Sequence, residues 1–156
     1  QVVYPTEGGS KMIRQAEKNE AMRVAELALL LWPNNDLAAF TKEFKAWIED
    51  DEALILLALD QGYAVGFAQC QLRHDYVEGT DSSPVGYLEG LYVKEAYRMK
   101  GIANELVKSC ELWAKDKKCR EFASDCELSN DASIRMHKKL GFTEANRIVC
   151  FTKTLR

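Results

Sequence analysis

The sequence predicts a mixed α+β fold, in which one central sheet has helices on both of its faces. The apolar run at residues 53–59 has the length and composition of a buried strand. Residues 102–114 instead place their apolar side chains at helical spacing, which predicts an amphipathic helix with one apolar stripe. Along the whole chain the patterns follow the order β-α-α-β-β-β-α-β-α-β-β. This order is typical of a mixed sheet covered on both sides.

The length of 156 residues suits one domain with a substantial core. Residues 1–11 are polar, contain Pro5 and a Gly-Gly-Ser run, and precede Met12, the first plausible start. We interpret residues 1–11 as a leader or an expression-tag remnant, and we expect them to be disordered. Residues 12–156 are then a single domain.

Two helices are predicted in the N-terminal part of the domain. Residues 12–16 form a short first strand, and the helix after it ends at Trp32, because Pro33 cannot continue a helix. Asp36 has the position of an N-cap for the second helix. The apolar face of that second helix consists of Leu37, Phe40, Phe44, Trp47 and Ile48.

The middle of the chain is predicted to form a hairpin and then a strand that carries an acid. The Asp-Gln-Gly turn at residues 60–62 joins the strand at residues 53–59 to a strand at residues 63–73. After a polar loop, residues 85–93 form an apolar strand whose acidic side chain is Glu89. The amphipathic helix follows.

The C-terminal part is predicted to contain one helix and three strands. Residues 120–127 form a strand with Asp125 near its C-terminal end. Asn130 and Asp131 cap a helix that closes on Gly141. The helix covers residues 132–140, and the two short terminal strands cover residues 142–146 and 148–154.

Composition excludes several classes of protein. The chain is 47% hydrophobic and 29% charged, as in ordinary globular domains, and its net charge of −3 argues against nucleic acid as the main partner. The longest apolar run is too short to span a membrane. Five scattered cysteines and two histidines show no metal-ligand spacing, so we expect a reduced, cytoplasmic protein without a metal or structural disulfides.

Residues 97–104 combine the features of an anion site. They lead from the apolar strand into the amphipathic helix, and they contain Arg98, Lys100 and Gly101. Free backbone N–H groups at a helix start, basic side chains and a glycine that admits close approach suit a phosphate or a pyrophosphate. An ordinary strand-to-helix turn is the alternative interpretation.

The Arg-x-x-Gly-x-Ala spacing of this loop resembles the pyrophosphate loop of GCN5-related (GNAT) N-acetyltransferases. A second segment, which begins at Asn130-Asp131-Ala132-Ser133 and ends at Leu140-Gly141-Phe142, resembles that family's second cofactor segment. Further segments resemble one branch of the family, the aminoglycoside 6′-N-acetyltransferases. They are Leu31-Trp32-Pro33, Arg73-His74-Asp75-Tyr76-Val77, Asp81-Ser82-Ser83-Pro84, Leu88-Glu89-Gly90 and Ala123-Ser124-Asp125.

The resemblance implies the GNAT fold, whose mixed, mostly antiparallel sheet splays between its fourth and fifth strands. It also implies acetyl-CoA, released as coenzyme A, as the co-substrate, and no metal. The strand after Glu89 would pair with pantetheine, and the start of the following helix would hold the pyrophosphate. The residues that the resemblance assigns to coenzyme A are Leu91, Tyr92, Val93, Arg98, Lys100, Gly101, Ile102, Ala103, Asn104, Asn130, Ser133 and His137.

Two acids at strand ends are the candidate catalytic residues. Carboxylates there can bind a cationic amine and take its proton, directly or through water. By resemblance Asp125 is the base and Glu89 the substrate anchor, although the two roles could be exchanged. The alternative is that each is a rim carboxylate paired with a lysine.

The other candidate substrate-binding residues are Trp32, Tyr76, Glu78 and Glu144. Trp32 could cover the sugar rings with its apolar face, or be a core residue at a helix end. Tyr76 and Glu78 belong to a loop that in this branch reaches the substrate cleft, partly across a dimer interface; a surface position without a role is the alternative for Glu78. His137 stands where many relatives have a tyrosine that protonates the departing thiolate; a packing role is the alternative that we favour.

The resemblance therefore implies an aminoglycoside 6′-N-acetyltransferase that confers antibiotic resistance, and a homodimer without nucleic-acid or membrane partners. One alternative is a GNAT enzyme that acetylates polyamines or the lysine and N-terminal amines of proteins. The other is a non-catalytic acyl-CoA-binding module, which would need the loop at residues 97–104 but neither Glu89 nor Asp125.

Overall fold

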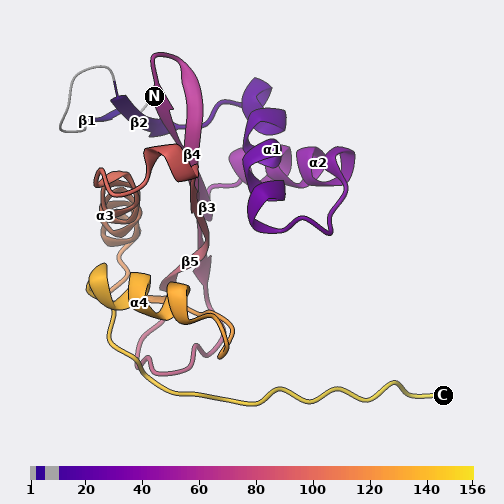
Figure 1. Cartoon of the computed structure of the whole chain (residues 1–156). Coiled ribbons are helices and arrows are strands. Elements are labelled where there is room, and N and C mark those ends of the chain that lie inside the picture. Colours follow the sequence, from indigo (N-terminus) through magenta and orange to yellow (C-terminus); the bar gives the residue numbers. More distant parts are fainter. Residues whose placement is uncertain (1–2, 6–10) are drawn as a thin grey trace.

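The computed structural model describes residues 3–5 and 11–156, and these residues form one six-stranded sheet with helices on both faces (Figure 1). The strand order along the sheet is the order along the chain. Neighbouring strands are antiparallel from the first to the fifth, whereas the last pair is parallel. The strands are β1 (Val3–Pro5), β2 (Lys11–Gln15), β3 (Ala53–Asp60), β4 (Tyr63–Arg73), β5 (Val85–Val93) and β6 (Phe122–Ser124). The predicted mixed, mostly antiparallel sheet is confirmed.

Two pairs of helices cover the two faces of the sheet (Figure 1). Helices α1 (Ala21–Leu31) and α2 (Leu37–Ile48) lie on one face, and helices α3 (Ile102–Asp116) and α4 (Asp131–Lys139) lie on the other. Two short 3₁₀ helices, η1 (Lys18–Glu20) and η2 (Glu95–Tyr97), precede α1 and follow β5. Each face has its own apolar core, one centred on Phe44 and Phe67 and the other on Leu106 and Val107.

The helix ends follow the capping residues that the sequence predicts. Asp36 accepts a hydrogen bond from the backbone N–H of Ala39 at 2.9 Å, and Asn130 accepts one from Ser133 N–H at 3.1 Å. Gly141 adopts φ +94°, and the backbone bonds that follow α4 form a Schellman motif. The observed α4, Asp131–Lys139, agrees with the predicted helix to within one residue at each end.

The β3–β4 turn is also as predicted, because Gln61 and Gly62 both have positive φ angles. At the N-terminus, Val3–Pro5 pairs with β2, whose first residue is Lys11. The rest of the predicted leader, residues 1–2 and 6–10, lies outside the described residues. A leader that spans residues 1–11 stays a prediction.

The two predicted terminal strands are wrong for the structure of this single chain. No strand is formed by residues 142–156. Phe142 still packs on Phe122, with ring centroids 5.9 Å apart, and Asn146 still bonds to Glu78, but the chain after residue 147 runs away from the domain (Figure 1). A strand needs a paired neighbour, and residues 147–156 pair with none of the described strands of this copy of the chain.

The buried carboxylate of Glu20 joins β2 to α1. Arg14 donates to both oxygens of Glu20, at 2.6 and 2.8 Å, and Arg23 donates to Oε2 at 2.9 Å. The backbone N–H of Glu17 donates to Oε1 at 3.0 Å. These bonds hold the pKa of Glu20 well below its ordinary value, at about 2.

Candidate active site

The parallel pairing of β5 with β6 is short, and its end determines where the two predicted acids lie. The ladder runs from Gly86↔Phe122 to Leu88↔Ser124 and stops there. Glu89 and Asp125 are therefore the first residues beyond the last pair, Glu89 within β5 and Asp125 just after β6. Past this point β5 continues to Val93 without a β6 partner, which agrees with the splay between the predicted fourth and fifth strands.

A β-bulge turns Glu89 toward the face of the sheet that α1 and α2 cover. In the β4–β5 register, Gln69 pairs with Gly90 and Cys70 pairs with Leu88, so Glu89 has no opposite residue. Leu88 lies in the core beneath α3. Gly90 lies against Trp32 on the opposite face, where a Cβ atom would come within 2.5 Å of the indole.

Glu89 is held by a two-point ion pair. Arg73 Nε donates to Oε1 at 3.0 Å and Arg73 Nη2 donates to Oε2 at 2.9 Å. In the amide orientation that satisfies both of its neighbours, Gln71 donates to Glu89 Oε1 at 3.2 Å and accepts from Trp47 Nε1 at 3.1 Å. Burial raises the pKa of Glu89, and the Arg73 guanidinium opposes that rise.

Asp125 is connected to the same cluster through a tyrosine. The hydroxyl of the buried residue Tyr87 donates a hydrogen bond to Asp125 Oδ2. The Arg73 guanidinium carbon lies 3.4 Å from the centre of the Tyr87 ring. Burial, followed by the hydrogen bond to Asp125, raises the pKa of Tyr87. Arg73 and Tyr87 thus link the two carboxylates.

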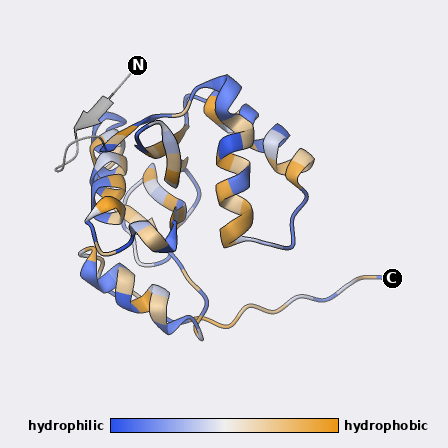
Figure 2. Cartoon of the chain, turned by 45° about the horizontal axis from the view of Figure 1, so that its top comes forward, coloured by the Kyte–Doolittle hydropathy of each residue, from blue (hydrophilic) through white to orange (hydrophobic). Residues whose placement is uncertain are grey.

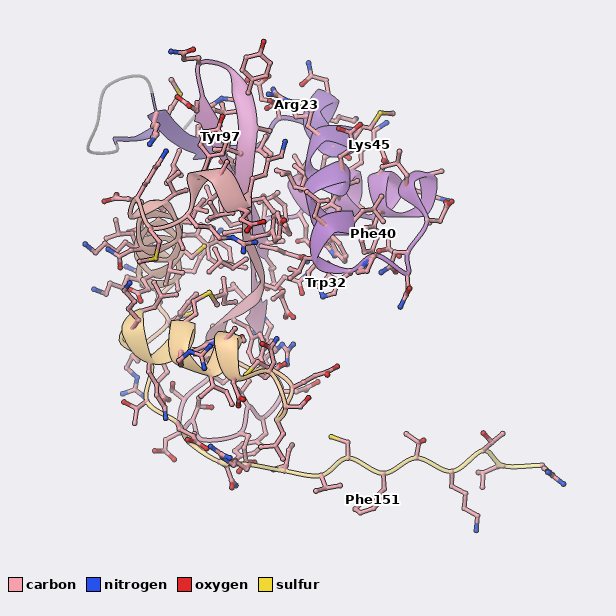
Figure 3. The ribbon with its side chains drawn as sticks, viewed as in Figure 1. Arg23, Trp32, Phe40, Lys45, Tyr97 and Phe151 are labelled. Atoms are coloured by element: carbon pink, nitrogen blue, oxygen red, sulfur yellow. The ribbon has the colours of Figure 1, made fainter. Side chains whose placement is uncertain are left out.

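Glu89 also forms one side of a pocket of about 350 Å³. Trp32, at the end of α1, packs edge-on against Phe40 of α2 and against Phe67, with ring centroids 6.1 and 6.3 Å apart (Figure 3). The pocket therefore combines aromatic faces with polar groups from the sheet. Its lining consists of Trp32, Asn35, Phe40, Phe44, Trp47, Gln69, Gln71 and Glu89.

Four predicted substrate-binding residues lie outside this lining: Asp125, which is joined to it through Tyr87 and Arg73, and Tyr76, Glu78 and Glu144. Tyr76 is 77% exposed on the loop between β4 and β5. Glu78 of the same loop accepts a hydrogen bond from Asn146 Nδ2 at 2.7 Å. Glu144 pairs with Arg147 and Lys138, which lowers its pKa. The structure thus brings Trp32 and Glu89 together in the pocket and leaves Tyr76, Glu78 and Glu144 at its outside.

The loop before α3 has the backbone that an anion would need. Gly101 adopts φ +81°, and a Cβ atom there would meet nothing within 4 Å. No side chain caps the first turn of α3, so the N–H groups from Ile102 to Asn104 stay open to a ligand. Arg98 Nε donates to the carbonyl of Val93 at 2.8 Å, and Lys100 lies 5.5 Å from the Tyr97 ring centre. These residues fit a pyrophosphate.

On the other side of the splay, His137 is engaged at both ring nitrogens. Nδ1 lies 2.7 Å from the carbonyl oxygen of Ser133, which can only accept, so Nδ1 carries the proton of that bond. Nε2 lies 2.8 Å from Ser124 Oγ, and the ring packs edge-on against Phe142. His137 therefore connects α4 to β6, as the packing interpretation expects.

Side chains that could hold a metal do not gather in the described part of the chain, residues 3–5 and 11–156: no group of three or more His, Cys, Asp or Glu residues has a suitable arrangement. All five cysteines are free thiols. No helix in these ranges is long and apolar enough to cross a bilayer.

Sequence reasoning missed the polar strip on β4. Gln69, Gln71 and Arg73 alternate along the strand, so their side chains share the face that α1 and α2 cover. Polar residues at every second position of an otherwise apolar strand were a visible signal of a polar pocket wall. Trp47 and Tyr87 gave no such signal, because a core aromatic produces the same pattern.

Comparisons with known proteins identify the class. The sequence profile of the acetyltransferase (GNAT) family matches residues 21–142, and the chain belongs to this family. The acyl donor of the chain is acetyl-CoA, the donor that GNAT acetyltransferases use, and solved structures of the family contain coenzyme A.

Individual relatives carry one name. Aminoglycoside N(6′)-acetyltransferase type 1 of Salmonella enteritidis is 37% identical over 141 residues, which cover 90% of this chain and 97% of the relative. The protein of that name from an Acinetobacter species, genomosp. 13, is 44% identical over 128 residues, with coverage of 81% and 87%.

Solved structures agree with these relatives. AAC(6′)-Iy in complex with the bisubstrate analogue CoA-S-monomethyl-acetylneamine superposes with a TM-score of 0.88 at 36% identity, covering 93% of this chain and 99% of that one. The aminoglycoside 6′-N-acetyltransferase AAC(6′)-Ih from Acinetobacter baumannii has a TM-score of 0.88 at 38% identity, with coverage of 94% and 99%.

Proposed function

We propose that this chain transfers the acetyl group of acetyl-CoA to the 6′-amine of aminoglycoside antibiotics and thereby confers resistance. The observation that carries the proposal is the pair Glu89 and Asp125 at the end of the β5–β6 ladder, beside an aromatic pocket. Carboxylates attract a polycationic sugar, and aromatic faces cover its rings. The names of the relatives support the same substrate class.

The reaction needs a neutral amine close to the thioester. The amine nitrogen forms a bond to the acetyl carbon, the C–S bond breaks, and the proton from nitrogen passes to Asp125, directly or through one water. Glu89 holds the cationic acceptor in line. The products are the N-acetyl aminoglycoside and the thiolate of coenzyme A.

The coenzyme A site is assigned to the splay and to the start of α3. Leu91, Tyr92 and Val93 follow the last β5–β6 pair, so the freed edge of β5 faces pantetheine. The N–H groups at the start of α3, with Arg98, Lys100 and Gly101, hold the pyrophosphate. Ser133, Asn130 and His137 of the α4 segment line the pantetheine arm.

The outer wall of the acceptor site is assigned to Trp32 and to the loop between β4 and β5. Trp32 closes the aromatic side of the pocket, against Gly90. Tyr76, Glu78 and Glu144 add an exposed ring and two carboxylates at the rim. Free thiols are consistent with a cytoplasmic location.

A thiol-release assay tests the function directly. The purified chain is mixed with acetyl-CoA and, in parallel, with tobramycin, kanamycin, spermine or a lysine peptide. We expect release with the two aminoglycosides, and product mass should place the acetyl group on the 6′ nitrogen. Release with spermine or peptide alone would contradict the proposal, and release with none would favour a non-catalytic acyl-CoA-binding module.

We further propose that the chain is a homodimer in which the C-terminal segment of each copy pairs with the other copy. The C-terminal segment, residues 148–156, is exposed and carries apolar side chains (Figure 2). Its residues Ile148, Val149, Phe151 and Leu155 are 62%, 72%, 89% and 85% exposed. Phe151 points away from the domain (Figure 3). β6 lies at an edge of the sheet, and such an edge accepts a further strand.

Removing residues 148–156 should convert the dimer to a monomer, because the segment would supply the apolar strand of the interface. Light scattering after gel filtration should give about twice 17.7 kDa for the full chain and 17.7 kDa less the deleted residues for the truncated one. Phe151→Asp should act like the truncation, whereas Lys153→Gln in the same segment should leave the dimer intact. A monomeric full chain, or a dimeric truncated chain, would contradict the arrangement.

A further inference from the structure

Arg73 is a cation placed inside a site that is proposed to bind a cation. Its guanidinium covers both oxygens of Glu89, at 3.0 and 2.9 Å. An acceptor ammonium that approaches Glu89 therefore meets a carboxylate that is already paired. The ion pair has to be opened or shared before Glu89 can anchor a substrate.

The surroundings of Arg73 allow this exchange. Its side chain is 42% exposed and that of Glu89 is 20% exposed, so the arginine is the more accessible partner. Arg73 is the last residue of β4, beside the loop between β4 and β5. The face of Tyr87, 3.4 Å from the guanidinium carbon, provides a second favourable contact that does not involve Glu89.

We propose that Arg73 is an internal counter-ion of Glu89, which keeps this carboxylate ionised and oriented in the free enzyme and is replaced there by an ammonium group of the acceptor. Arg73 is thus a positioning residue and also a competitor of the substrate. The proposal rests on the proposed function, since it assumes a polycationic acceptor.

The groups around Glu89 determine the effect of removing Arg73. Cys70 and Tyr87 are neutral at physiological pH, and Asp125 repels the charge of Glu89. From α2, the pocket side is lined by Phe40, Phe44 and Trp47. Arg73 is therefore the cation that opposes the effect of burial on the pKa of Glu89. Without Arg73 this pKa should rise further.

Arg73→Gln should produce two changes of opposite sense. The acidic limb of the kcat/KM profile should shift to higher pH by about half a pH unit or more, because Glu89 loses its counter-ion. At about pH 8, where Glu89 stays ionised, the KM for tobramycin should fall roughly three- to tenfold, because the competing cation is gone. If Arg73 had a purely structural role, Arg73→Gln would raise KM at every pH and would not shift the acidic limb.

Two further variants separate charge from geometry. Arg73→Lys keeps the charge, so its acidic limb should stay near that of the unmodified enzyme. Lys117→Gln removes one positive charge from an exposed position after α3 and should change neither KM nor the limb. Calorimetric binding of tobramycin by Arg73→Gln, measured across pH, gives the same comparison if turnover is too slow to follow.

The outcomes distinguish this inference from the function itself. If the unmodified chain acetylates no aminoglycoside, the proposed function fails. If it does, but Arg73→Gln binds tobramycin more weakly at about pH 8 and its acidic limb is unchanged, Arg73 is a structural residue and the counter-ion inference alone is overturned.

Discussion

Replacing Asp125 by asparagine should lower kcat for tobramycin roughly 10²- to 10⁴-fold, the usual contribution of a general base. Asparagine keeps the shape of the side chain and an oxygen that can accept from the Tyr87 hydroxyl. The variant therefore loses the proton acceptor and retains the geometry around it. Steady-state kinetics with both substrates measure the change.

Glu89→Gln is the matched variant, because it removes the charge of the other carboxylate. If Glu89 is the anchor, its loss should chiefly raise the acceptor KM, while the KM for acetyl-CoA stays near that of the unmodified enzyme. A large fall in kcat for Glu89→Gln with normal turnover in Asp125→Asn would mean that the two roles are exchanged.

Glu20→Gln should destabilise the fold by roughly 3 kcal/mol at neutral pH, because Arg14 and Arg23 would lose a buried carboxylate. The pKa of Glu20 is depressed from 4.5 to about 2, so the ion pairs contribute fully above pH 4.5. This contribution disappears as pH falls through about 2. Urea unfolding at a series of pH values should therefore show the two proteins converging in acid.

Glu49→Gln is the control for this prediction. Glu49 pairs with Lys18 at 2.7 Å, but its side chain is 51% exposed, so its removal should change the unfolding free energy little. Equal destabilisation by the two variants, or a Glu20→Gln effect that persists unchanged in acid, would show that burial of the Glu20 ion pairs is not the cause.

Much of the fold could be predicted because local signals agree with packing. Asp36, Gly101 and Gly141 mark helix ends that the structure confirms, and the Asp-Gln-Gly turn marks the hairpin. One acid in an apolar strand also singled out Glu89, which lies in the middle of β5, just past the last β5–β6 pair, and lines the pocket.

Contacts between distant parts of the chain could not be predicted in the same way. The pairing of Arg73 with Glu89 depends on β4–β5 register, and the bulge that sets this register has no sequence signal of its own. The link from Tyr87 to Asp125 depends on the parallel pairing of β5 with β6. The terminal strands were wrong because a local pattern predicts extended backbone but does not ensure that it pairs with a neighbouring strand.

The bulge at Glu89 makes the site depend on residue count as well as residue identity. Side chains of a regular strand alternate, and Leu88 and Leu91 pack on the same side only because the extra residue lies between them. Deleting Glu89 would restore simple alternation, keep both leucines on the side of α3, and remove the carboxylate from the pocket. Shortening β5 by one residue at this point should therefore abolish acceptor binding while the sheet still forms.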